Sequence, residues 1–163
     1  MNNTEEVPIR DAATVILLRK KKDSTYVLMG QRGNKAVFMP SKYVFPGGAV
    51  DEDDSKVKLF KSIDGKGIDL LHQYSKKKIA KELCVAAIRE LWEEAGLRLC
   101  AKVEDVGTIS PGWEDFCNST FLPDASNLEY VFRAITPPGR PRRFDARFFI
   151  CRAENVHGNL DDF

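Results

Sequence analysis

The strongest structural signal in this sequence is an amphipathic segment that runs from about Lys77 to Ala95 and stops at Gly96. Its apolar residues recur with the helical period, and glycine is the residue most often found just beyond the last helical turn. At about 100° per residue, one side of this helix gathers Cys84, Val85, Ala87, Ile88, Leu91, Trp92 and Ala95. We expect that side to face a core and the opposite side to remain open.

The open side of the predicted helix carries Glu82, Arg89, Glu90, Glu93 and Glu94. Glu90 and Glu94 stand at i,i+4 with like charge, an arrangement that is mildly destabilising on its own. A divalent cation relieves such repulsion, and hard cations such as Mg²⁺ take oxygen ligands. Taken alone, the pattern therefore indicates either a solvated acidic surface or a metal site.

The rest of the chain is expected to form strands around this helix. Residues 12–19 and 26–32 predict a hairpin, and residues 103–109, 129–136 and 143–151 predict further strands. A length of 163 residues holds one domain. We therefore expect a single α+β domain over residues 1–163.

Charge and hydropathy limit the classes of partner that this chain is expected to bind. The net charge is +1, so no global field draws the chain to nucleic acid, and nucleic-acid binding is not expected. The run from Ala12 to Leu18 is too short to span a bilayer, and no membrane association is expected.

Residues 55–81 differ in composition from the rest, with eight lysines against two acids. No wide apolar face is visible in this stretch. We expect a helical insertion outside the core, and its lysines are either a solvated surface or an approach for an anionic substrate.

One nine-residue string carries a family resemblance. Arg89-Glu90-Leu91-Trp92-Glu93-Glu94-Ala95-Gly96-Leu97 is similar to the second half of the Nudix box, R-E-U-x-E-E-x-G-U, and Phe45-Pro46-Gly47-Gly48 resembles the glycine loop that opens it. Forty residues separate Gly48 from Arg89, more than the pattern allows, and the excess matches residues 55–81. The chain thus resembles Nudix hydrolases with a split box, as in the peroxisomal coenzyme A diphosphatase. The segments 38–40, 135–138 and 143–149 favour the same branch.

The resemblance implies a Nudix-type α/β/α sandwich with a mixed central sheet and an inserted helical segment. It implies that Glu90, Glu93 and Glu94 ligate Mg²⁺ or Mn²⁺, with the carbonyl of Gly47 as a further ligand. Arg89 would hold a helix carboxylate in place. The first glutamate of the box has no clear counterpart here, and the candidates for its role are Asp51, Glu52, Asp53, Asp54 and Glu82. The general base would be either a glutamate of the box or an acid from a later loop, for which Glu114, Asp115 and Glu129 are the nearby options.

The implied substrate is a small nucleoside diphosphate derivative. The branch favours coenzyme A or acyl-CoA; the alternatives are ADP-ribose, NADH, dinucleoside polyphosphates, or binding without catalysis in a regulator. Arg140, Arg143 and Arg147 either bind substrate phosphate or form ion pairs with Asp145. Trp113 and Phe116 either stack on a nucleobase or pack in the core.

The last predicted strand ends near Arg152, whereas Nudix domains of this type normally add another strand and a closing helix. We therefore expect either a C-terminus that is short relative to its relatives or a partner chain, such as a second copy in a homodimer, covering an exposed edge. The resemblance and the four scattered cysteines favour a reduced bacterial cytoplasm as the setting.

Overall fold

The structure is a computed structural model that describes residues 7–31, 33, 41–73 and 75–161. The chain begins with strands β1 (Ile9–Lys21), β2 (Ser24–Val27), β3 (Gly30–Gln31), β4 (Tyr43–Val44) and β5 (Gly47–Ala49). The 3₁₀ turn η1 (Glu52–Lys56) and the helices α1 (Gly65–His72) and α2 (Ala80–Ala95) follow. The second half holds β6 (Arg98–Lys102), α3 (Glu114–Cys117), β7 (Phe121–Pro123), β8 (Glu129–Ile135), β9 (Arg143–Arg152), η2 (Ala153–Asn155) and β10 (Val156–His157).

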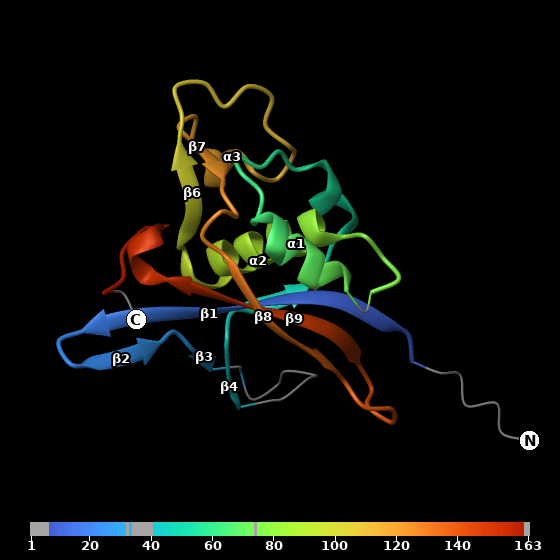
Figure 1. The fold of residues 1–163 in the computed structure, drawn as a ribbon. Helices are drawn as coiled ribbons and strands as arrows, with labels where there is room; N and C mark the ends of the chain where they lie inside the picture. The colour runs from blue at the N-terminus through green and yellow to red at the C-terminus, as the bar shows by residue number, and fades with distance from the viewer. Residues whose placement is uncertain (1–6, 32, 34–40, 74, 162–163) are drawn as a thin grey trace, which may run out of the picture.

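The main sheet is mixed, as predicted (Figure 1). Its order is β2-β1-β9-β8, and β5 also pairs with β1. β1 and β9 run parallel, from Ile9 beside Arg143 to Leu18 beside Arg152, whereas the other pairings are antiparallel. A small sheet of order β10-β6-β7 and the β3-β4 pair complete the strands of the described residues. The α+β fold with a mixed sheet is therefore confirmed.

Helix α2 crosses one face of the main sheet and provides much of the core. Ala13, Val15 and Leu17 of β1 are buried with the apolar residues of α2. The helix ends where the sequence predicts, because Gly96 adopts φ +65° and stops the helical hydrogen bonds. It begins at Ala80, three residues later than predicted from Lys77, and the side chain of Lys77 extends instead to Asp11.

The opposite face of the main sheet is apolar and carries no helix among the described residues. Helices α1, α2 and α3 lie on the same side of the sheet in Figure 1. By strand alternation the other side presents Ile16, Phe148 and Ile150. There the rings of Phe132 and Phe148 stack with centroids 4.3 Å apart, and Phe132 is 44% exposed.

The prediction that residues 55–81 lie outside the core is wrong. Val57, Ile63, Leu71 and Ala80 are all buried and belong to the same cluster as α2. The backbone of the segment is also tied to β7 and the turn that follows, where Phe60 N–H donates to Pro123 O and Ala125 N–H donates to Lys61 O. Single apolar residues between lysines reach the core without forming a continuous apolar stripe.

The predicted strand at 103–109 is also wrong. The strand lies earlier, as β6, and the chain after Lys102 turns. Gly107 adopts φ +64°, and its N–H donates to the carboxylate of Asp105. A local side-chain bond of this kind competes with strand pairing. The strands predicted at 129–136 and 143–151 are confirmed as β8 and β9.

Two further expectations concern residues 38–40 and the absence of a membrane-spanning segment. Residues 38–40, which support the branch-level resemblance, lie outside the described residues. Over the described ranges, no helix combines the length and apolar character that crossing a bilayer requires.

Candidate metal centre

The glycine loop and α2 meet at close range. Gly47 N–H donates to Oε2 of Glu94 at 3.1 Å. Gly48 pairs with Ala13 of β1, and a Cβ atom on Gly48 would overlap the carboxylate of Glu90. Glycine is therefore required at position 48, where a larger residue would displace Glu90 of the helix, and at position 47, where a Cβ atom would overlap Ala13 and Thr14 of β1.

Arg89 binds the carboxylates around it. Its Nη1 donates to Glu90 at 2.8 Å and to Glu93 at 3.3 Å, while Nη2 donates to the carbonyl of Ala49 at 2.9 Å. The guanidinium thus connects α2 to the end of β5. This geometry is what a residue needs if it is to hold two glutamates in fixed orientations.

Asp54 is the acid that completes this cluster. Its carboxylate is 2% exposed and accepts Nε of Arg89 at 3.1 Å and Nη2 at 3.3 Å. It also accepts the N–H of Asp51 at 2.8 Å, which closes η1. Among the candidates for the first box glutamate, the structure therefore joins Asp54 closely to Arg89. The sequence signal is its place six residues after Gly48, the spacing of the unsplit box.

Burial and neighbouring charges shift the pKa values of the ionisable groups at this site. Burial raises the pKa of Glu90, Arg89 opposes that shift, and the nearby charges of Glu94 and Glu93 add to it. Burial alone would lower the pKa of Arg89, but bonding to Asp54 and the charge of Glu90 raise it above its usual value. The arginine therefore stays cationic while the three glutamates repel one another.

The residues fit a divalent cation by chemistry and by shape. In the described part of the chain, no three acidic, histidine or cysteine side chains converge on a single point as they stand. Glu90 and Glu93 turn toward Arg89, and Glu94 turns toward Gly47. All three are hard oxygen donors on one flank of α2, and the bare Gly48 leaves room for the carboxylate of Glu90. The side chain of Glu93 is 53% exposed, so a cation could reach its carboxylate from solvent.

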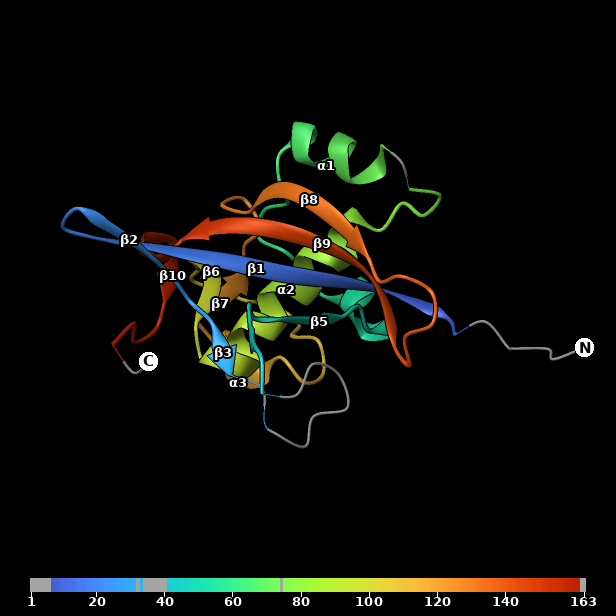
Figure 2. The ribbon, with the colours of Figure 1, turned by 90° about the horizontal axis from the view of Figure 1, so that it is seen from below.

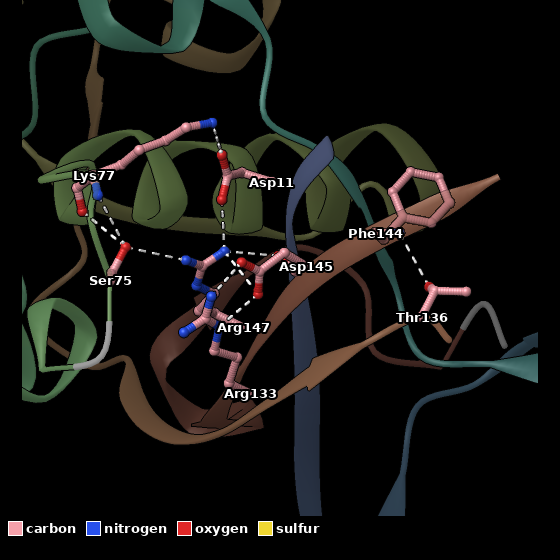
Figure 3. Close-up of polar contacts among 8 residues, drawn as sticks. All are labelled: Asp11, Ser75, Lys77, Arg133, Thr136, Phe144, Asp145 and Arg147. Atoms are coloured by element: carbon pink, nitrogen blue, oxygen red, sulfur yellow. Dashed lines mark hydrogen bonds and ion pairs between the residues drawn. The ribbon is translucent and has the colours of Figure 1, made fainter. Parts of the chain in front are cut away.

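Two of the predicted phosphate-binding arginines lie elsewhere (Figure 3). Arg147 is 2% exposed; its Nη1 donates to Asp11 at 2.7 Å and lies 3.2 Å from the carboxylate of Asp145. Arg143 is also buried, and its Nε donates to the carbonyl of Thr136 at 3.2 Å. Both guanidiniums are buried and bonded within the chain, and the role of Arg147 and Arg143 in phosphate binding stays a prediction. Arg147 does form the ion pair with Asp145 that was the alternative interpretation.

The remaining candidates are divided between surface and core. Arg140 is exposed in the connection between β8 and β9, and Glu114, Asp115 and Glu129 are exposed as well. Their proposed roles stay predictions. Trp113 and Phe116 are buried with ring centroids 4.9 Å apart. The packing interpretation therefore applies to those two rings.

Three comparisons with known proteins bear on this geometry. No protein-family model matches the chain. A Caenorhabditis elegans protein named "Putative nudix hydrolase 7" is 30% identical over 166 aligned residues, covering 90% of this chain and 45% of the relative. The chain therefore spans about half the length of the curated relative that it matches.

Among solved structures, a NUDIX hydrolase from Alicyclobacillus acidocaldarius aligns with 93% of this chain and 75% of its own, at a TM-score of 0.65 and 24% identity. A Caenorhabditis elegans Ap4A hydrolase aligns over 93% of this chain and 76% of its own with a TM-score of 0.39 and 16% identity, which is too low to establish a shared fold. The first alignment shows that the fold is the Nudix fold.

Proposed function

We propose that this chain, which has the Nudix fold, is a divalent-metal-dependent hydrolase of the diphosphate bond in nucleoside diphosphate-linked compounds. The observation that supports this most directly is the placement of Glu90, Glu93 and Glu94 on one flank of α2, against the Gly47–Gly48 loop and around Arg89. Three glutamates at this spacing repel one another and share a single arginine, and a divalent cation would relieve that repulsion.

Glu90, Glu93 and Glu94 would hold Mg²⁺ or Mn²⁺, with the carbonyl of Gly47 as a further ligand. When bound, such an ion lowers the pKa of water and neutralises charge on the diphosphate oxygens. Arg89 keeps Glu90 and Glu93 oriented through its Nη1, and Asp54 keeps Arg89 in place. In the overall reaction, the oxygen of water joins one phosphorus and the bond from that phosphorus to the bridging oxygen breaks. A proton accepted by a base completes the balance.

The base is an exposed acid. Glu114 and Asp115 of α3 and Glu129 of β8 are the candidates outside the metal flank. A carboxylate at one of these positions could accept the proton that the attacking water loses. Single replacement of each by its amide, with kcat measured against pH, will identify which one is needed.

We propose coenzyme A or an acyl-CoA as the preferred substrate, a choice that rests on the branch-level resemblance of the sequence. Hydrolysis of its diphosphate gives 4′-phosphopantetheine and 3′,5′-ADP. Arg140 is the exposed member of the arginine group and is available for the 3′-phosphate. A cytoplasmic setting remains a prediction of the same resemblance.

The deciding experiment compares coenzyme A, acetyl-CoA, ADP-ribose, NADH and diadenosine polyphosphates with Mg²⁺ and with Mn²⁺, and ranks them by kcat/KM. Coenzyme A ranking below another substrate by about tenfold, or 1.4 kcal/mol of transition-state preference, would exclude the coenzyme A assignment and leave the general one. Absence of turnover with every substrate, together with tight nucleotide binding, would identify a non-catalytic regulator instead.

A further inference from the structure

Helix α3 is a single turn that is held in place by a side chain from another element. It consists of Glu114–Cys117, and an isolated helical turn of this length is unstable in water. The last carbonyls of a helix have no partner within it. The side chain of Arg98 binds two of them here, because Nε donates to the carbonyl of Phe116 at 2.9 Å and Nη2 donates to the carbonyl of Asp115 at 3.0 Å. A cation is also favourable at the C-terminal end of a helix, so Arg98 stabilises α3.

The same guanidinium rests on helix α2. The Cζ atom of Arg98 lies 3.8 Å from the centroid of the Trp92 ring, well inside the range of a cation–π contact. The Trp92 ring also meets the buried Phe116 edge-on, with centroids 6.0 Å apart. Arg98 therefore connects α3 to the last turns of α2. Trp92 directly precedes Glu93, one of the proposed metal ligands.

Helix α3 presents acids to solvent from an anchored turn. Phe116 and Cys117 are buried. Glu114 and Asp115, which are candidates for the general base, are exposed. Figure 2 shows α3 next to α2, toward the border of the molecule opposite β8. Because the turn is anchored to α2, the positions of both acids are fixed relative to the helix that carries the metal flank.

The remaining candidate for the base outside the metal flank, Glu129, is placed differently. It pairs with Ile150 of β9, and by strand alternation it therefore belongs to the face of the sheet opposite α2. Strands β1 and β9 also lie between β8 and β5, so β8 runs about 14 Å from the strand of the glycine loop. A base must come within hydrogen-bond reach of the proton that it accepts, directly or through one water. The geometry therefore favours α3 over β8 as the source of the base.

We propose that Arg98 is a positioning residue of the hydrolase, an inference that rests on the proposed function. It holds α3 against α2, so that the carboxylate of Glu114 or Asp115 receives the proton lost by the water that attacks phosphorus, and later releases it to solvent. Arg98 bonds to carbonyls and to a ring, so it acts through α3. Lysine cannot replace it, because an ammonium group lacks the planar fork that donates to two carbonyls while stacking on a ring.

Arg98→Lys tests the proposal, with kcat and KM measured for whichever of coenzyme A and ADP-ribose the wild type hydrolyses faster with Mg²⁺. We expect kcat to fall by about tenfold or more, because a well-placed base contributes about 10²–10⁴-fold. KM should change by less than about twofold, since ground-state binding is untouched. Arg152→Lys makes the same change at an exposed position of β9 and should alter neither constant.

Combining variants separates positioning from general structural support. Glu114→Gln and Asp115→Asn identify the acid, and the one that lowers kcat more is then combined with Arg98→Lys. The combined variant should lose less than about threefold beyond the acid variant alone, because both changes remove the same function. Losses that multiply would overturn the proposal. So would an unchanged kcat in Arg98→Lys, or an unchanged kcat in both amide variants, which would move the base to the metal flank.

Tryptophan fluorescence tests the contact without any activity measurement. The two tryptophans of the chain, Trp92 and Trp113, both pack against Phe116 of α3. Arg98→Lys should therefore shift the emission to longer wavelength as the Trp92 ring loses its cover. Mn²⁺ affinity, measured by calorimetry, should stay within about threefold of the wild type, because the glutamates of α2 are unchanged. An unchanged emission would contradict the contact.

The outcomes distinguish this inference from the proposed function. A wild type that hydrolyses none of the substrates would overturn the proposed function, and the role of Arg98 with it. An active wild type whose Arg98→Lys variant shows the emission shift but normal kcat would overturn the positioning role alone. If Arg98→Lys melts below the assay temperature, Trp92→Phe replaces it with the same expectations, since phenylalanine keeps a ring but binds the guanidinium more weakly.

Discussion

The carboxylate of Asp54 holds the guanidinium of Arg89 through two nitrogens, at 3.1 Å and 3.3 Å, across a sequence gap that contains α1. The contact joins the buried residue of an otherwise exposed 3₁₀ turn to the flank of α2 on which the three glutamates stand. The interrupted box is therefore continuous in space, because the chain between its halves leaves η1 and returns to α2 beside it.

Asp54→Asn should lower the free energy of unfolding by about 3 kcal/mol, because it removes the buried carboxylate that pairs with two nitrogens of a largely buried arginine. Asp53→Asn is the matched control, since Asp53 is 78% exposed and pairs with Lys56 at the surface; we expect a change below about 1 kcal/mol there. Urea titration of the two variants measures both values. Equal losses would show that the buried pair contributes little.

Glu93→Gln should retain the fold and lose divalent-dependent hydrolysis by about 100-fold or more, because an amide oxygen replaces a charged metal ligand. Thermal melting reports the fold, and product release with Mg²⁺ reports the rate. Glu104→Gln removes a charge from an exposed loop and should leave both unchanged. Turnover of Glu93→Gln near the wild-type value would rule out Glu93 as a ligand.

Gly48→Ala should reduce activity more than stability. The added methyl group overlaps the carboxylate of Glu90, which must rotate away from the position that the loop allows. Gly65→Ala tests the same change where a Cβ meets nothing within 4 Å at the first turn of α1, and it should be neutral or slightly stabilising. Comparable kcat values for the two variants would contradict a role for close approach at Gly48.

Because of Asp11, the free energy of unfolding should depend on pH in the acid range. Burial by itself raises the pKa of this carboxyl, but hydrogen bonds from Lys77 and Arg147 outweigh it and lower the pKa below its usual 3.8. The stabilisation is therefore present above the unfolded-state pKa and is lost as the pH falls through the lower folded-state value. Asp11→Asn should destabilise at neutral pH, and its difference from the wild type should narrow below about pH 4. A difference that stays constant with pH, measured by urea unfolding, would exclude this carboxylate as the cause.

Replacement of residues 58–76 by a short linker should unfold the domain. The deletion removes Ile63 and Leu71 from the core and the backbone bond between Phe60 and Pro123. Loss of two large buried side chains costs about 4 kcal/mol or more, a large share of the stability of a typical domain. Circular dichroism and amide exchange report the outcome; a cooperative melt near the wild-type temperature would show that the segment is dispensable.

The sequence predicts the elements that have regular periodicity. The buried arc of α2 and its end at Gly96 follow from the spacing of apolar residues and from one left-handed glycine. The role of residues 55–81 could not be predicted, because Val57, Ile63 and Leu71 contact the core singly from turns and a short helix. A lysine-rich composition describes the exposed side of that segment and says nothing about its few anchors.

The candidate site also has one part that the sequence predicts and one part that it does not. The glutamates and Arg89 stand together because they share one helix, so their proximity can be predicted from local geometry. The ion pair of Arg147 with Asp11 depends on the parallel register that sets Ala13 beside Arg147. Sequence alone does not reveal that long-range pairing, so an arginine among phenylalanines could be interpreted as a ligand for phosphate.

The parallel pairing of β1 with β9 also has a consequence for how the molecule is made. β1 is synthesised at the start of the domain and its longest neighbour at the end, so the centre of the sheet cannot close until β9 has left the ribosome. Until then α2 can already pack on β1, β5 and β6, but β1 lacks the strand that pairs with it from Ile9 to Leu18. Nascent chains halted before β9 should therefore expose one edge of β1 and be clients of chaperones.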